Sequence, residues 1–139
     1  MKTITKTPEE TIKLGKKIAQ KLTEGATVAL YGNLGSGKTH LIKGIGLGLK
    51  VKTIINSPTF TLINEYQGKF PLYHFDLYRI NSVDEAYLLG IEEYFNNKGI
   101  VVIEWAERIT EILPENSIKI ELKFINREKR AIKIKGLPL

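Results

Sequence analysis

The 139-residue sequence predicts an α/β protein with a mixed central sheet, and three observations lead to this prediction. Residues 27–31 and 100–104 are short apolar runs of the kind that form buried parallel strands. A glycine-rich segment joins the first run to a helical pattern, which is the order of a strand–loop–helix unit. Residues 118–126 and 131–135 alternate between apolar and polar, so we expect an antiparallel pair of half-buried strands near the end.

The first element is expected to be a helix that begins after Thr7. Thr7 can act as the N-cap, Pro8 suits the first helical position, and Glu10 completes a capping box. Apolar spacing continues this helix to about residue 22, and Gly25 ends it.

The middle of the chain alternates between strands and helices. A glycine-rich loop at 32–39 precedes a helix at 40–49, in which apolar residues recur every four positions. Residues 60–66 and 72–77 are rich in aromatic and β-branched side chains, and a short glycine-containing segment separates them. This pattern predicts a hairpin.

Two further helical segments are expected around the second buried strand. Residues 82–85 begin a helix that Gly90 interrupts, and residues 92–95 continue it as a short turn. Residues 106–112 form another helix, which Pro114 ends.

Composition narrows the class of protein. Apolar residues make up 42% of the chain and charged residues 26%, as in a soluble globular protein, and we expect one domain over residues 1–139. The chain has no cysteine, which excludes disulfides and thiolate chemistry, and its two histidines argue against a histidine-rich metal site. No apolar run approaches the roughly 18 residues of a membrane helix. The beginning lacks the apolar core of a signal peptide, so we expect a cytosolic protein without membrane contact.

The net charge of +6 is unevenly distributed. Residues 1–52 contain ten basic and three acidic residues. Residues 53–117 contain four basic and ten acidic residues, and residues 118–139 contain seven basic and two acidic residues. Basic ends around an acidic middle suit a phosphate-rich ligand or partner, although a solvated lysine-rich surface would give the same pattern.

The glycine-rich loop fits the pattern G-x-x-x-x-G-K-S/T at every fixed position: Gly32-Asn33-Leu34-Gly35-Ser36-Gly37-Lys38-Thr39. Its glycines let successive backbone amides point at phosphate oxygens, and the following helix adds its positive end. Lys38 can reach the β- and γ-phosphates, and the Thr39 hydroxyl can ligate Mg²⁺. With a strand before it and a helix after it, this loop predicts a three-layer P-loop NTPase-like fold with a parallel core and antiparallel hairpin additions. The expected ligands are ATP and Mg²⁺; the alternative is a glycine-rich turn with an incidental Lys and Thr.

Two acids end apolar strands. A P-loop site needs a carboxylate for Mg²⁺ and a residue that orients the attacking water. Glu104 closes the run at 100–104, where parallel strands present groups to a ligand. Asp76 ends the second hairpin strand, although Arg79 nearby offers a purely structural ion-pair partner. We predict that both acids contribute to the metal and hydrolysis site.

Other candidates are less specific on their own. Thr59 could sense the γ-phosphate or belong to a simple turn, and Trp105 could lie over the site or be a packed aromatic. His40 could approach the α-phosphate or be an ordinary residue of the first helical turn. Arg127 and Arg130 are, by residue type alone, part of a solvated turn.

Four separated segments, taken together, resemble the TsaE (formerly YjeE) family of small bacterial P-loop ATPases required for threonylcarbamoyl modification of tRNA adenosine. They are the P-loop, Ser57-Pro58-Thr59-Phe60-Thr61-Leu62, His74-Phe75-Asp76-Leu77-Tyr78-Arg79 and Ile103-Glu104-Trp105. The segments occur in family order, and the resemblance covers nearly the whole chain.

The resemblance implies roles for individual residues. Lys38 and Thr39 would bind phosphate and Mg²⁺, and Thr59 would belong to a switch-like loop near the γ-phosphate. Asp76 and Glu104 would be the acids of the metal and hydrolysis site.

Four more positions complete the implied nucleotide site. Trp105 would share the functional face, and Pro8 and Arg127 would border the base. His40 departs from the Thr or Ser that the family commonly has there, and we expect its larger side chain to alter the α-phosphate contacts while leaving the catalytic assignment intact.

The resemblance also implies partners. The protein would dock on a TsaD–TsaB heterodimer, in which TsaD is the transferase, and ATP hydrolysis would reset that complex between turnovers. Contact with tRNA would be indirect or occur at the complex. We expect weak activity alone, with the partner ordering residues 57–61. A small P-loop kinase and a nucleotide-gated binding module without catalysis remain the alternatives.

Overall fold

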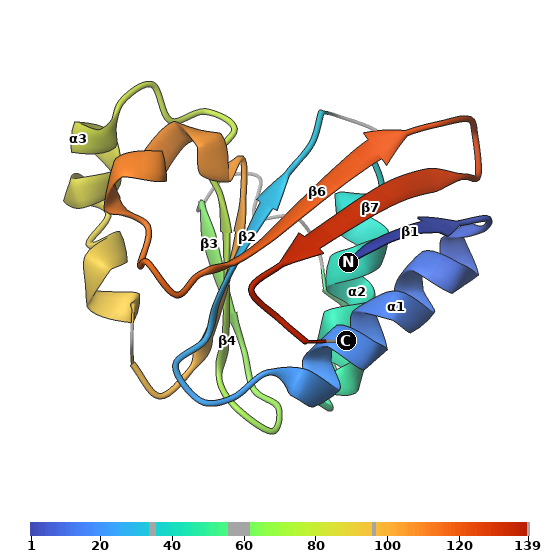
Figure 1. Cartoon of the computed structure of the whole chain (residues 1–139). Helices are drawn as coiled ribbons and strands as arrows, with labels where there is room; N and C mark the ends of the chain where they lie inside the picture. The colour runs from blue at the N-terminus through green and yellow to red at the C-terminus, as the bar shows by residue number, and fades with distance from the viewer. Residues whose placement is uncertain (34–35, 56–61, 96, 139) are drawn as a thin grey trace.

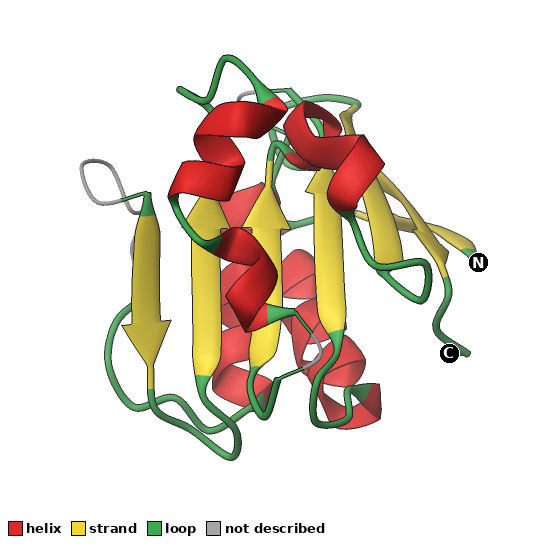
Figure 2. Ribbon diagram, turned by 90° about the vertical axis from the view of Figure 1, so that its left-hand side faces the viewer, coloured by secondary structure: helices red, strands yellow, loops and turns green. Residues whose placement is uncertain are grey.

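A computed structural model describes residues 1–33, 36–55, 62–95 and 97–138 and shows a seven-stranded sheet between two helical layers (Figures 1 and 2). The strands are β1 (Lys2–Thr5), β2 (Thr27–Tyr31), β3 (Ile63–Tyr66), β4 (Leu72–Asp76), β5 (Ile100–Glu104), β6 (Ile118–Phe124) and β7 (Arg130–Lys135). The helices are α1 (Pro8–Lys21), α2 (Lys38–Gly48) and α3 (Val83–Leu88), with the 3₁₀ segments η1 (Ile91–Tyr94) and η2 (Ala106–Ile112).

The strand order β1-β7-β6-β2-β5-β4-β3 confirms the predicted mixed sheet. Strand β2 is parallel to β5 and to β6, and β4 is parallel to β5. The hairpin β3–β4 and the pair β6–β7 are antiparallel additions, as predicted. Every residue of β5 and all but the last of β2 are buried, which is why these strands appear in the sequence as unbroken apolar runs.

Two cores lie on opposite faces of the sheet. On one face, α1 and α2 cover residues such as Leu30, Val102 and Ile120. On the other face, α3, η1 and η2 cover Phe75 and Ile103 among others. In Figure 2 the second group of helices lies in front of the sheet and the first group lies behind it. None of the helices in the described ranges is long and apolar enough to cross a membrane.

Three local features differ from the expectations. Strand β1 was not predicted, because four residues with one apolar side chain give no clear pattern; it forms by antiparallel pairing with β7. Helix α2 begins at Lys38, two residues earlier than predicted. Residues 106–112 form 3₁₀ turns with a kink at Ile109 rather than a regular helix.

Helix α1 begins as the sequence predicts, with one shift in its capping pattern. The Thr7 hydroxyl accepts a hydrogen bond from the Glu10 amide at 3.1 Å. The Glu10 carboxylate accepts from the amide of Lys6 at 3.2 Å, one residue before the amide that a standard capping box uses.

Candidate active site

The P-loop leaves the carboxyl end of β2 and turns into α2 through Gly37. Gly37 has a φ of 99°, in the left-handed region that glycine occupies without strain. The start of α2 has no side-chain cap and no acidic residue in its first turn. Its backbone amides and the positive end of the helix dipole are therefore suited to an external anion.

The Lys38 side chain lies between the first residue of the loop, Gly32, and the ring of Trp105. Its Nζ donates a hydrogen bond to the Gly32 carbonyl at 2.5 Å and lies 4.1 Å from the centroid of the Trp105 ring. Burial lowers the pKa of the Lys38 ammonium from its usual value, while the Glu104 carboxylate opposes this shift. The only side-chain cation of the P-loop is thus held close to the acids at the ends of the neighbouring strands.

The two predicted acids lie side by side. Asp76 is paired with Glu104 in the parallel register of β4 and β5, at the carboxyl end of both strands. The Asp76 Oδ1 accepts a hydrogen bond from the Tyr78 amide at 3.0 Å. Burial raises the pKa of Asp76, and the nearby Glu104 charge adds to the rise, while the Tyr78 hydrogen bond and the positive charges of His74 and Lys38 oppose it.

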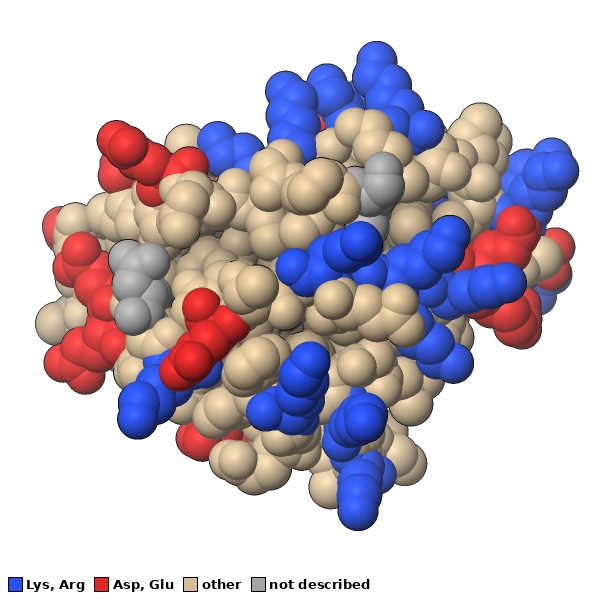
Figure 3. Space-filling model, turned by 60° about the horizontal axis from the view of Figure 1, so that its bottom comes forward, with Lys and Arg blue, Asp and Glu red and all other residues tan. Residues whose placement is uncertain are grey.

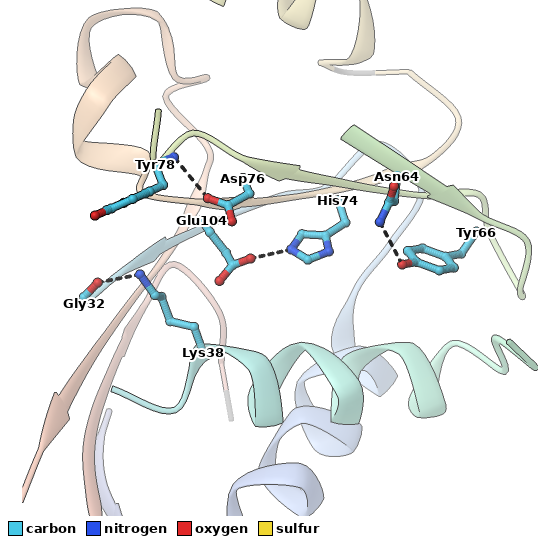
Figure 4. Close-up of polar contacts among 8 residues, drawn as sticks. All are labelled: Gly32, Lys38, Asn64, Tyr66, His74, Asp76, Tyr78 and Glu104. Atoms are coloured by element: carbon cyan, nitrogen blue, oxygen red, sulfur yellow. Dashed lines mark hydrogen bonds and ion pairs between the residues drawn. The ribbon is translucent and has the colours of Figure 1, made fainter. Parts of the chain in front are cut away.

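His74 is a site residue that the reasoning from residue types missed. Its Nε2 lies 2.7 Å from the Oε2 of Glu104, and both side chains are almost fully buried (Figure 4). His74 precedes Asp76 by two residues on the same strand, so both project to the same face of the sheet. The two-residue spacing of His74 and Asp76 was visible in the sequence. No local pattern indicated that Glu104, on the neighbouring strand β5, would lie next to His74.

The backbone at Trp105 is unusual. Trp105 has a φ of 61°, in the left-handed region that a bulky side chain rarely adopts. This turn directs the chain from β5 into η2 and places the indole against Lys38, with the Tyr78 ring 5.1 Å away and the Arg108 guanidinium 5.7 Å away. Trp105 therefore contacts the site as well as its own core.

A hollow of about 260 Å³ brings most of the predicted residues together. The predicted residues that line it are Ser36, Gly37, Lys38, Thr39, His40, Asp76, Glu104 and Trp105. Tyr78 and Arg130 also line it, although neither was assigned to the site. Arg130 reaches it because β7 carries it beside Gly37, and its Nη1 donates to three turn carbonyls, those of Asn126, Arg127 and Lys129.

Several predicted residues are not brought into this hollow. Pro8 occupies the first position of α1 and Arg127 is exposed in the turn between β6 and β7; neither is among the described lining residues. Asn33 lines a neighbouring hollow of about 480 Å³ beside β6. Leu34, Gly35 and Thr59 lie outside the described residues.

Unsatisfied polar atoms cluster at the site. Four buried side-chain polar atoms lack a hydrogen-bond partner among the described residues, and three belong to residues of this site: Ser36 Oγ, His74 Nδ1 and Arg130 Nε. Because buried polar atoms are normally paired, this concentration indicates a place where a polar ligand completes the structure.

The donor set also fits Mg²⁺. The Thr39 hydroxyl and the carboxylates of Asp76 and Glu104 are hard oxygen donors. Within the described ranges, no three His, Cys, Asp or Glu side chains are grouped to hold a metal by themselves. Mg²⁺ usually takes one or two carboxylates together with waters and substrate phosphates.

Three comparisons with known proteins give consistent results. The family model described as "Threonylcarbamoyl adenosine biosynthesis protein TsaE" matches residues 5–132. The chain is 37% identical over 134 residues to the tRNA threonylcarbamoyladenosine biosynthesis protein TsaE of Treponema pallidum, covering 96% of this chain and 99% of that protein. It is 44% identical to the Bacillus subtilis TsaE over 126 residues, 90% of this chain and 78% of that protein. A crystal structure of Bacillus subtilis YdiB superposes with a TM-score of 0.82 at 38% identity, covering 95% of this chain and 82% of that one.

Proposed function

Because the chain belongs to the TsaE family of tRNA threonylcarbamoyladenosine (t6A) biosynthesis proteins, a family of P-loop ATPases, we propose that it binds ATP with Mg²⁺ and hydrolyses it. One observation carries the proposal. The uncapped start of α2, the Lys38 ammonium and the acids Asp76 and Glu104 converge on one hollow. Phosphoryl transfer depends mainly on such positioning and charge neutralisation.

Each group has a separate task in the proposed reaction. The amides at the start of α2 and the Lys38 ammonium bind the β- and γ-phosphate oxygens. Thr39 and Asp76 would hold Mg²⁺, which neutralises phosphate charge when it is bound. Glu104 accepts a hydrogen bond from the attacking water and orients it toward the γ-phosphate.

His74 acts as a positioning residue for Glu104. Its Nε2 lies 2.7 Å from Oε2 of the carboxylate, which fixes the rotation of the group and leaves Oε1 to meet the water. Both residues are buried, so solvent competes little for this hydrogen bond. His74→Ala is expected to lower kcat about tenfold or more with little change in KM, and His74→Gln, which keeps a donor, should recover part of the loss.

A protein partner is the second part of the proposal. The chain would dock on a TsaD–TsaB complex, and ATP hydrolysis would drive that complex through its cycle. Tyr78, which lines the hollow, and Tyr87 and Leu88 of α3 have exposed side chains, with Leu88 at 88% exposure. Exposed large apolar side chains suit a protein partner that covers them.

The test is ATP turnover with Mg²⁺, measured as ADP and free phosphate, with and without TsaD–TsaB. We expect slow turnover alone, faster turnover with the complex, and loss of both in Glu104→Gln. Full turnover by the isolated chain would contradict partner activation. ADP formed without free phosphate would instead indicate transfer to an acceptor, as in a kinase, and tight ATP binding without any ADP would indicate a nucleotide-gated binding module.

A further inference from the structure

The three strands β6, β7 and β1 have one covered face and one uncovered face. Their apolar side chains, such as Ile120, Leu122 and Ile132, pack in the core under α1 and α2. The alternate residues project to the opposite side. There, α3, η1 and η2 lie in front of the sheet (Figure 2), and Lys119, Glu121, Lys123 and Lys135 are exposed.

The uncovered face is strongly basic. The antiparallel register places Lys119 opposite Lys135 and Lys2 opposite Lys133, with Lys123 on the same face of β6. We call these five residues the lysine face. Its other members are Ile4, Glu121 and Ala131, so the face carries a charge of +4, five lysines against one glutamate.

This arrangement is unfavourable for folding. Like charges that lie directly opposite each other in a sheet repel, and each such pair destabilises the fold. Among the described residues, the only ion pair is His74–Glu104, so no carboxylate lies within ion-pair distance of the lysine face. Glu121 is in register with Lys133 and still makes no ion pair with it. The lysines are therefore unneutralised and available to an external polyanion.

We propose that the lysine face binds the phosphate backbone of tRNA. Lysines are depleted in the centre of protein–protein interfaces, whereas nucleic-acid phosphates are bound mainly by Lys and Arg. The face carries no aromatic side chain that could stack on a base, so the contact reads the backbone and not the sequence. A hollow of about 650 Å³ follows the face and is lined by Lys2, Ile4, Glu121, Lys123, Ala131 and Lys133 among others.

The position of this face relates it to the nucleotide site. Glu121 and Lys123 also line the hollow of about 480 Å³ that holds Asn33 and Ser36 of the P-loop. An RNA strand on the lysine face would therefore pass beside the P-loop. The choice of tRNA over other polyanions rests on the t6A assignment. Binding is measured without ATP, so a failure of the ATPase proposal leaves this test unaffected.

The experiment compares two variants of the full chain with the same loss of charge. The sheet variant carries Lys119→Gln, Lys123→Gln, Lys133→Gln and Lys135→Gln. The control variant carries Lys13→Gln, Lys16→Gln, Lys17→Gln and Lys21→Gln, which removes four exposed lysines from α1. The control is needed because basic side chains also spread across the middle and right of the surface seen from below (Figure 3).

Fluorescence anisotropy of a labelled, unmodified tRNA transcript provides the readout, between 50 and 200 mM KCl. If four lysines each release a counterion, the wild-type affinity should fall about 50- to 150-fold over this range. The sheet variant should lose most of the affinity at 50 mM and most of the salt dependence, and the control variant should keep both. Replacing the same four sheet lysines by arginine should preserve binding, and Glu121→Gln should tighten it.

Three outcomes would overturn the proposal. The first is no tRNA binding by the wild-type chain at 50 mM KCl. The second is an equal loss in the sheet and control variants, which would show nonspecific attraction to net charge. The third is intact tRNA binding by the sheet variant together with lost binding to TsaD–TsaB, which would make the face a protein interface. Thermal unfolding separates these results from misfolding, because removing opposed lysines should leave the sheet variant at least as stable.

Discussion

The two long helices pack against each other but begin in opposite ways. Helix α1 begins at Pro8 behind a Thr7 cap, with Glu9 and Glu10 in its first turn. Helix α2 begins at Lys38 behind a left-handed Gly37, without a side-chain cap and without an acid. Helix α1 pairs its first amides and its dipole with its own side chains, whereas α2 has neither a side-chain cap nor an acid in its first turn.

The acids that would complement the α2 dipole are located on other elements. Asp76 and Glu104 stand at the ends of β4 and β5, facing the start of α2 across the hollow. A phosphate bound between them would complete the helix end and face the acids through a metal ion. If α2 binds phosphate as proposed, the missing cap costs local stability at α2 and leaves its first amides available to the nucleotide.

The largest expected effect follows from removing the cation at the start of α2. Lys38→Ala should weaken ATP binding and reduce turnover at least about 100-fold, because Lys38 is the only cation of the P-loop itself and Arg130, which also lines the hollow, is held by three turn carbonyls. The matched control is Lys43→Ala, an exposed lysine on the same helix, which should behave as wild type. Nucleotide binding and turnover measured side by side check the prediction, and equal behaviour of the two variants would refute it.

The next effect concerns the backbone of the turn. Gly37→Ala places a side chain on a residue with φ 99° and brings its Cβ to 3.2 Å from the Arg130 side chain. We expect a loss of about 1–2 kcal/mol in the free energy of unfolding from the left-handed conformation, together with weaker ATP binding. Urea unfolding and nucleotide titration give the two values, and unchanged nucleotide affinity would show that the turn tolerates a Cβ.

A substitution at the start of α1 should lower stability without changing ATP affinity. Thr7→Ala removes the side chain that accepts the Glu10 amide and is expected to cost about 1 kcal/mol of stability. ATP affinity should stay at the wild-type value, since the described residues of the hollow do not include Thr7. A change in affinity would mean that the two helix starts are coupled.

The smallest expected effect on stability comes from the carboxyl group of Asp76. The pKa of Asp76 is raised in the folded chain by burial, so the folded state holds this proton more tightly than the unfolded state does. The resulting stabilisation is present at low pH and is lost as pH rises through the folded pKa. Asp76→Asn should therefore gain stability relative to wild type as pH increases, while ATP turnover falls. Urea unfolding of both proteins from pH 4 to pH 7 tests the sign.

Local patterns in the sequence anticipated most of the fold. The predicted first and last residues of β2 and β5 are confirmed. These strands were easy to delimit because strands buried on both faces of a sheet consist mainly of apolar residues. The start of α1 was predictable because Thr7, Pro8 and Glu10 act within one turn. The antiparallel pair β6–β7 was visible because alternation marks a half-buried strand.

Contacts between distant segments escaped this reasoning. Strand β1 forms because it pairs with β7, which lies more than a hundred residues further along the chain. Arg130 lies in what is locally a polar turn, and only the order of the sheet brings it to Gly37. The hydrogen bond between His74 and Glu104 likewise depends on the pairing of β4 with β5.

By itself, therefore, the sequence determined most of the elements, the P-loop and the two strand-end acids, because helix caps, apolar periodicity and glycine-rich turns act over a few residues. Tertiary structure alone decided which of these groups meet. Sheet order and register set the His74–Glu104 contact, the place of Arg130 and the assembly of the lysine face from three strands. The physical reason is that strand pairing joins residues that are far apart in the chain, and no local pattern records which strands will be neighbours.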